Sequence, residues 1–315
     1  MNKPLADKIA SIESIQTGFR EFGYICSKNI ATAVFLAYKL EKPILVEGPP
    51  GVGKTELAKA ASQFLQLPMT RLQCYEGLDE AKAIYEWKYG KQLLYTQILK
   101  EELQDVLKGA KGLEASINRL HEFGDIFYSM EFLEPRPLLK AIQEPQGTVL
   151  LVDEIDKADQ EFESLLLEIL SDYQISIPEI GTLTANSTPL VILTSNNTRE
   201  ISDALKRRCL HVYIPLPDAD LERAIIQARV PDINEVLKNQ LVHFVQTVRQ
   251  LELKKVPSIS ETIDWARTLI LLNSDALNPE LVKDTLNVIL KFQEDIEEIQ
   301  SDVQTLTNKA ISEIA

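Results

Sequence analysis

The chain has 315 residues, a length that favours about two domains. Apolar residues make up 45 % of it and charged residues 25 %, which excludes a largely disordered protein. Lysines and arginines number 33 against 47 aspartates and glutamates, and the net charge of −14 argues against broad contact with nucleic-acid phosphates.

Membrane and secretory features are not predicted. The longest apolar runs, such as 148–152 and 190–193, are far shorter than the roughly 18 residues that a membrane helix needs. Residues 1–16 alternate charged with apolar side chains and contain no apolar signal-peptide core. Three isolated cysteines suit a reducing compartment. We therefore expect a cytoplasmic protein that contacts no membrane.

Short β-rich runs alternate with helical patterns as far as Pro217. In chain order these runs are 43–47, 69–75, 148–153, 189–195 and a shorter one at 211–215. Because they are apolar, show little alternation and are separated by helices, they predict a parallel sheet that is covered on both faces. Residues 1–216 are accordingly expected to form an α/β domain.

Beyond Pro217 the β signal is absent and apolar residues recur at helical spacing. Helices are expected near 218–229, 233–251, 258–272 and 279–299. These segments predict a small all-helical domain over residues 217–315. The tail from residue 301 fits either one more helix or a frayed end.

Residues 48–55 read GPPGVGKT and match the pattern G-x-x-x-x-G-K-[ST]. Glycines let backbone N–H groups turn inward around phosphate oxygens, Lys54 supplies a positive charge, and the Thr55 hydroxyl can ligate Mg²⁺. A strand-like run precedes the loop and a helical run follows it, so a turn that matches by chance is the weaker interpretation. We expect nucleotide to be bound by Gly48, Pro49, Pro50, Gly51, Val52, Gly53, Lys54, Thr55 and Glu56.

Residues 149–156 read VLLVDEID, an apolar strand that ends in carboxylates. Ligands of parallel sheets bind at the carboxyl ends of the strands. Asp153 is expected to hold the hydration shell of Mg²⁺, and Glu154 to be the general base for an attacking water. Asp156 is expected to cap a helix or to support the site without reacting.

More chain separates Lys54 from Asp153 than one strand and one helix need, which indicates an insert at about 81–137. Its aromatic residues Tyr85, Trp87, Tyr89 and Tyr95 precede a charged helical segment at 100–123. Local packing is the favoured interpretation of the aromatic residues, and a surface for a partner or substrate is the alternative.

The run 189–197 ends in Asn196 and Asn197. A side-chain amide there, preferably that of Asn196, is expected to lie beside the acidic strand and to fix the attacking water or touch the γ-phosphate. Arg207 and Arg208 then follow near the end of a short helix, where they can favour the helix dipole. In a ring of identical subunits, an arginine at this place can instead reach the γ-phosphate bound by a neighbour.

In this order, GPPGVGKT, VLLVDEID, LTSNN and LKRRC resemble an AAA+ ATPase. The resemblance implies a P-loop NTPase core with a central parallel sheet flanked by helices, plus a small all-helical lid. More narrowly the chain resembles the MoxR branch, and within it the ATPases associated with carbon monoxide dehydrogenase maturation. The narrower resemblance rests on four strings: RLQCYEGLDEAKAIYEW (71–87), EFLEPRPLLKAI (131–142), EFESLLLEILSDYQISIPEIGT (161–182) and PSISETIDWARTL (257–269).

By this resemblance, Lys54 and Thr55 contact phosphate and Mg²⁺, and Asp153 and Glu154 are the metal ligand and the base. Asn196 is assigned to sensor 1 and Arg208 to the arginine finger. A hairpin at 174–184 and a helix-2 insert near 81–110 are implied to face a pore or substrate.

One position departs from the family pattern. Ser260 stands where relatives carry the sensor-2 arginine of the lid. Lid control of the γ-phosphate is therefore absent, or it comes from another residue such as Arg267.

The resemblance implies a ring of identical subunits, a hexamer, that hydrolyses ATP in the presence of Mg²⁺ to remodel or mature a client protein. It also implies a partner with a von Willebrand factor A domain and a client metalloenzyme. Two alternatives are a nucleotide-gated assembly scaffold with little hydrolysis and a chelatase-like motor that inserts a metal ion. DNA translocation is disfavoured by the net charge of −14.

Overall fold

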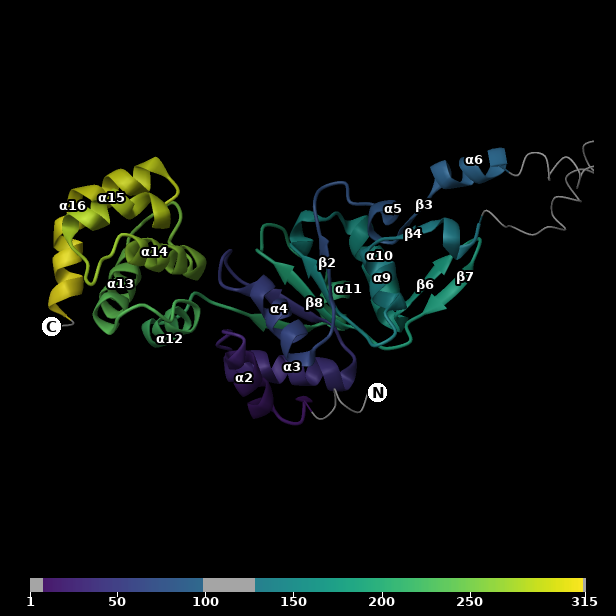
Figure 1. The fold of residues 1–315 in the computed structure, drawn as a ribbon, viewed down its shortest axis with the longest axis horizontal. Helices are drawn as coiled ribbons and strands as arrows, with labels where there is room; N and C mark the ends of the chain where they lie inside the picture. The colour runs from purple at the N-terminus through teal and green to yellow at the C-terminus, as the bar shows by residue number, and fades with distance from the viewer. Residues whose placement is uncertain (1–7, 99–127, 314–315) are drawn as a thin grey trace, which may run out of the picture.

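A computed structural model describes residues 8–98 and 128–313 (Figure 1). An α/β core comes first in the chain and a group of helices follows it. Among the helices of the described residues, none is both long enough and apolar enough to cross a membrane.

The core is built on a five-stranded parallel sheet within the described residues. Its strands are β1 (Ile44–Glu47), β2 (Met69–Gln73), β5 (Val149–Asp153), β8 (Leu190–Ser195) and β9 (Leu210–Tyr213). They lie in the order β2-β5-β8-β1-β9, and every neighbouring pair is parallel. The register places Glu47 beside Ser195 and Gln73 beside Asp153, so the carboxyl ends of the strands share one edge. The expected α/β fold with a central parallel sheet is confirmed.

Helices cover both faces of the sheet (Figure 1). One face carries α2 (Ile12–Glu21), α3 (Lys28–Leu40) and α4 (Lys54–Leu65), and the other carries α9 (Pro137–Gln143), α10 (Gln160–Asp172) and α11 (Asp203–Arg208). Alternate residues of a strand serve the two layers: Leu151 packs in the α2–α4 layer, whereas Leu150 and Val152 pack in the other. Burial on both faces explains why the strands read as continuous apolar runs.

Two small antiparallel sheets, each of two strands, project from the core. The first pairs β3 (Tyr85–Trp87) with β4 (Leu133–Pro135). Three short helices neighbour these strands in the sequence: α5 (Glu80–Ala83), α6 (Tyr89–Ile98) and η1 (Met130–Phe132). The second pairs β6 (Gln174–Ile177) with β7 (Gly181–Thr184), inside the range expected for a hairpin.

Aromatic residues of the predicted insert pack mostly on one another. Trp87 contacts Tyr85 and Tyr128 edge to face, and Tyr95 contacts Phe132 in the same way. Tyr89 is exposed. Local packing is thus observed for three of the four aromatic residues, and the expected charged segment at 100–123 lies outside the described residues.

The helical lid comprises α12 (Ala219–Arg229), α13 (Glu235–Val248), α14 (Ile259–Leu271), α15 (Pro279–Ile289) and α16 (Gln293–Ser312). These helices share their own apolar core around Phe244 and Trp265. The prediction of a single helix at 279–299 is wrong, because α15 ends before Leu290. Leu290 has an extended backbone, and its side chain is buried in the lid core. The tail continues as α16.

Candidate functional site

The loop between β1 and α4 is closely enclosed. A Cβ at Gly48 would lie 2.2 Å from the carbonyl oxygen of Ile214. Gly51 has φ +76°, and a Cβ there would lie 2.2 Å from Ser258 Oγ. Both positions therefore require glycine, and α4 begins directly after the loop, so its N-terminal dipole faces the same space.

Lys54 is buried beneath this loop. Its Nζ donates to the carbonyl oxygens of Gly48 and Pro49, each at 2.7 Å. Burial lowers the pKa of Lys54, and the negative charges of Asp156, Asp153 and Glu154 oppose that effect. Two backbone carbonyl oxygens of the loop thus hold the ammonium group of Lys54 in place.

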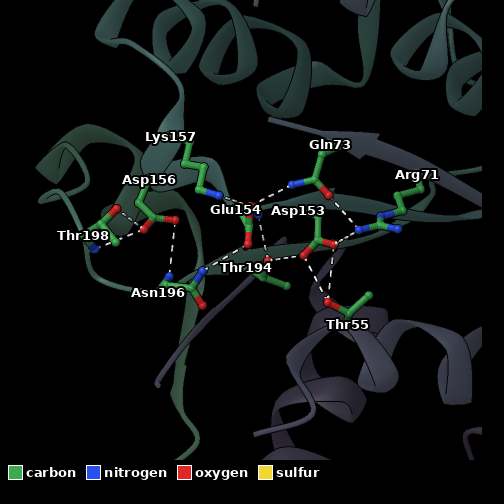
Figure 2. A network of polar contacts seen from close by, with 10 residues as sticks. All are labelled: Thr55, Arg71, Gln73, Asp153, Glu154, Asp156, Lys157, Thr194, Asn196 and Thr198. Carbon is green, nitrogen blue, oxygen red and sulfur yellow. Dashed lines mark hydrogen bonds and ion pairs between the residues drawn. The ribbon is translucent and has the colours of Figure 1, made fainter. Parts of the chain in front are cut away.

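Asp153 ends β5 with its side chain 5 % exposed. It accepts hydrogen bonds from Thr194 Oγ1 at 2.6 Å and from Thr55 Oγ1 at 3.2 Å. Arg71 Nη2 donates to its other oxygen at 2.6 Å (Figure 2). The two residues predicted to hold Mg²⁺, Thr55 and Asp153, are therefore in direct contact.

Glu154 lies just beyond the strand in the left-handed region, with φ +57°, which is uncommon for a residue with a side chain. Its carboxylate accepts from Asn196 Nδ2 at 3.2 Å, from Gln73 Nε2 at 2.9 Å and from Lys157 Nζ at 2.6 Å (Figure 2). The structure thus brings the predicted base and the predicted amide together. It also adds two donors that the sequence did not indicate.

Asp156 lies in the short helix η2 (Ile155–Lys157), buried behind Asn196. It accepts from the backbone N–H of Asn196 at 3.2 Å and from both N–H and hydroxyl of Thr198, at 3.0 and 2.6 Å. Burial alone would raise the pKa of Asp156, but these hydrogen bonds outweigh it and lower the pKa. Asp156 therefore positions the loop that carries Asn196, a supporting role rather than a reactive one.

A cleft of about 790 Å³ opens over these groups, large enough for a nucleoside triphosphate. Its floor is formed by the 50–56 loop with Asp153, Glu154 and Asn196. One wall comes from residues 23–30, between α2 and α3, and another from α12 and α14 of the lid. The sequence did not indicate the wall at 23–30, whose only local signal is Gly23 in a short break between helices.

Ser260, at the expected sensor-2 place, contacts the loop directly. Its backbone N–H and its hydroxyl both lie within hydrogen-bond distance of the carbonyl oxygen of Gly51, at 3.2 and 3.3 Å. A second link joins Arg229 of α12 to Glu56 of α4 at 3.3 Å. Arg267 also lines the cleft, 3.8 Å from Asp264 on its own helix.

Arg207 and Arg208 are exposed at the end of α11 and line no part of this cleft. The short helix places three basic residues in its last turn, which the helix dipole favours. A single chain therefore does not bring Arg208 to its own phosphate loop.

Arg71, Gln73 and Lys157 are the residues of the site that sequence reasoning missed. Arg71 and Gln73 alternate along β2, so they share one face of the strand. They meet Asp153 and Glu154 because β2 pairs with β5 in the sheet. The local signals were two polar side chains two residues apart in a short strand and, for Lys157, its place three residues after Glu154.

The chain is similar in sequence to a known protein family and to proteins of two staphylococci. The model of the AAA domain family, dynein-related subfamily, matches residues 43–209, more than half of the chain. An uncharacterized protein of Staphylococcus epidermidis is 26 % identical over 271 residues, covering 84 % of this chain and 89 % of that protein. One of Staphylococcus aureus is 26 % identical over 256 residues, covering 77 % and 82 %.

Among solved structures, a mutant form of Thermotoga maritima RuvB has a TM-score of 0.46 and 18 % sequence identity. The match covers 83 % of this chain and 68 % of that chain.

Proposed function

The chain belongs to the AAA domain family, dynein-related subfamily, and we therefore propose that it hydrolyses ATP to ADP and phosphate to remodel a client protein. The observation that carries this proposal is the meeting of Glu154 with Asn196 at the edge of a cleft floored by the phosphate loop. An acidic base beside a positioned amide is what activation of a water molecule requires.

The residues of the loop and of β5 fit a nucleotide with its metal. The cradle of residues 48–54 binds the phosphates, and Lys54 supplies a point charge to them. Thr55 and Asp153 present the hard oxygen donors that Mg²⁺ prefers, 3.2 Å apart. A magnesium ion bound there supplies positive charge opposite the charge that develops on the phosphates.

Glu154 accepts a proton from the attacking water at a carboxylate oxygen, and Asn196 Nδ2 orients that carboxylate. In the structure, Oε2 of Glu154 is held by both Gln73 and Lys157. These two donors engage the lone pairs of Oε2, so we propose that Lys157 moves away before Oε2 accepts a proton from the water.

We propose that the active form is a ring, as a hexamer, in which Arg208 of one subunit reaches the nucleotide of the next. Its support is the exposed position of Arg208, outside the cleft of its own chain. An arginine from a neighbour stabilises the charge of phosphoryl transfer and makes hydrolysis depend on assembly.

The finer proposal concerns the client. The resemblance of residues 71–87 and 257–269 to the MoxR branch supports a partner with a von Willebrand factor A domain and a client metalloenzyme. We propose a cytoplasmic setting and a division of the chain into an ATP-binding domain at 1–216 and a lid at 217–315.

The test is turnover and binding in the Glu154→Gln variant. We expect ATP binding to persist and phosphate release to fall by about 10²-fold or more, because a general base contributes that much. The control is Glu161→Gln, an exposed glutamate of α10. Undiminished phosphate release in Glu154→Gln would contradict the assignment of Glu154 as base.

A second candidate function, a nucleotide-gated scaffold with little hydrolysis, is favoured by one observation. Ser260 joins the lid to the phosphate loop without placing a cation there. Steady-state phosphate release separates the two functions, because a remodelling motor is stimulated by its client and a scaffold is not.

A further inference from the structure

Arg71 forms the only ion pair of Asp153 among the described residues. Its Nη2 lies 2.6 Å from Asp153 Oδ2 and also 2.6 Å from Gln73 Oε1 (Figure 2). The guanidinium is half-exposed and lines the cleft, whereas the carboxylate is almost wholly buried. The solvent-facing guanidinium of Arg71, on its long side chain, therefore forms an ion pair with the fixed, buried carboxylate of Asp153.

This position is the one where the proposed function puts a divalent cation. An unpaired buried carboxylate is costly, so Arg71 stabilises Asp153 when no other cation is near. A guanidinium and a divalent cation that share one carboxylate would repel each other, because both positive charges would lie close to the same oxygen atoms. Only one of the two can therefore be seated on Asp153 at a time.

We infer that Arg71 is a built-in counter-ion that competes with Mg²⁺ for Asp153. The inference rests on the proposed function, since it concerns the same metal site. It explains how a carboxylate that is only 5 % exposed is stabilised before a metal binds. Thermodynamic linkage is reciprocal. The factor by which the metal weakens the Arg71–Asp153 ion pair is therefore also the factor by which Arg71 weakens metal binding.

Displacement of Arg71 also reaches the base. The same Nη2 holds Gln73 Oε1, and Gln73 Nε2 holds Glu154 Oε2 at 2.9 Å. When Arg71 leaves both Asp153 and Gln73, the Gln73 amide loses one of the two side-chain hydrogen bonds that hold it among the described residues. Binding of the metal at Asp153 thereby changes the hydrogen bonding of the Glu154 carboxylate, which accepts the proton.

The alternative role for Arg71 is that of a direct phosphate ligand, and the two roles predict different binding. The quantity to measure is the ratio of two dissociation constants for ATP, one in EDTA and one in excess Mg²⁺, obtained by calorimetry on the full chain. In Arg71→Gln, binding in EDTA weakens because Asp153 is left unpaired beside the phosphates. Binding in Mg²⁺ tightens because the competitor is gone.

We expect the ratio to rise about fivefold or more in Arg71→Gln, the lower end of ordinary coupling between sites. Arg71→Met, which keeps the length of the stem, must show the same rise if Arg71→Gln folds poorly. Arg223→Gln is the matched control, because Arg223 is a half-exposed arginine paired with Asp220 on the lid surface. Its ratio should equal that of the unaltered chain.

A ratio that stays unchanged or falls in both neutral variants overturns the inference, and equal weakening in both media identifies Arg71 as a phosphate ligand instead. Failure of the proposed function has a different outcome. In that case the unaltered chain binds no ATP in either medium, and Lys54→Ala behaves identically.

Discussion

Thr194 donates its hydroxyl hydrogen to Asp153 Oδ1 across 2.6 Å, and the same hydroxyl oxygen accepts the backbone N–H of Glu154 at 2.9 Å. One fully buried hydroxyl of β8 therefore fixes both members of the acidic pair at the end of β5. Valine has nearly the same shape and makes neither hydrogen bond.

We expect Thr194→Val to lower the free energy of unfolding by about 1–3 kcal/mol, because a buried donor and a buried acceptor lose their partner. ATP turnover should fall as well, since the carboxylates lose their alignment. Thr148→Val is the matched control: Thr148 is equally buried and donates to Pro68 at the opposite end of β5. Equal turnover in the two variants would show that Thr194 has no role at the site.

The carboxylate of Asp156 should make stability depend on pH. Its pKa is lowered in the folded chain, so it adds stability above the pKa of an unfolded aspartate, about 3.9. The stability difference between the unaltered chain and Asp156→Asn is therefore full at pH 7. The part of it that comes from the ionised carboxylate shrinks as pH falls through about 3.9 and disappears below the folded-state pKa. Urea unfolding between pH 7 and pH 3 measures it, and a constant difference over that range would exclude an ionised Asp156 as the cause.

Turnover should depend on Arg208 of a neighbouring subunit. Arg208→Ala alone is expected to lose about 10³-fold or more in kcat, the size of an arginine-finger effect. Glu154→Gln is expected to be inactive for a different reason. Mixing the two variants creates interfaces with one intact Glu154 and one intact Arg208, so part of the phosphate release should return.

Arg207→Ala is the control for this experiment, since Arg207 is exposed in the same turn of α11. Its turnover should stay close to that of the unaltered chain. If no mixing ratio restores phosphate release while native mass spectrometry shows mixed assemblies, Arg208 does not act across the interface.

Arg249 and Glu222 form a buried, two-pronged ion pair in the lid, with contacts of 2.7 and 2.8 Å and exposed fractions of 7 % and 0 %. Arg249 Nε also donates to Pro257, next to the segment that touches Gly51. Arg249→Met should lower the free energy of unfolding by about 3–5 kcal/mol, because Glu222 is left charged and unpaired.

The comparison for this variant is Arg223→Met, which removes an exposed ion pair with Asp220 on the same helix as Glu222. Its expected cost is about 1 kcal/mol or less. Guanidinium unfolding of both variants decides the point, and equal losses would show that burial of the Arg249 pair is unimportant.

Local patterns in the sequence predicted the elements that depend on neighbouring residues. The parallel strands follow from apolar runs, and the helix after the loop follows from its composition. The lid was predicted less well, because the break at Leu290 arises from burial of that side chain against other lid helices. Periodicity within one segment does not report such a contact.

The candidate site divides in the same way. Lys54 and Thr55 were identified because a phosphate loop is a local motif, and Asp153 and Glu154 because a strand end is a local feature. Arg71 was not, since nothing near it in sequence shows that it meets Asp153, whereas Lys157 lies only three residues after its partner Glu154 and was overlooked.

The sequence by itself identified the phosphate loop, because its glycines, Lys54 and Thr55 lie within one motif at 48–55 and Lys54 donates to the carbonyl oxygen of Gly48, six residues before it. Only the tertiary structure decided that Arg71 sits on Asp153 and that Ser260 closes on Gly51. Those contacts depend on the pairing of β2 with β5 and on the seating of the lid, and each joins residues that are far apart along the chain. Such contacts are selected by the packing of whole layers, which no local pattern encodes.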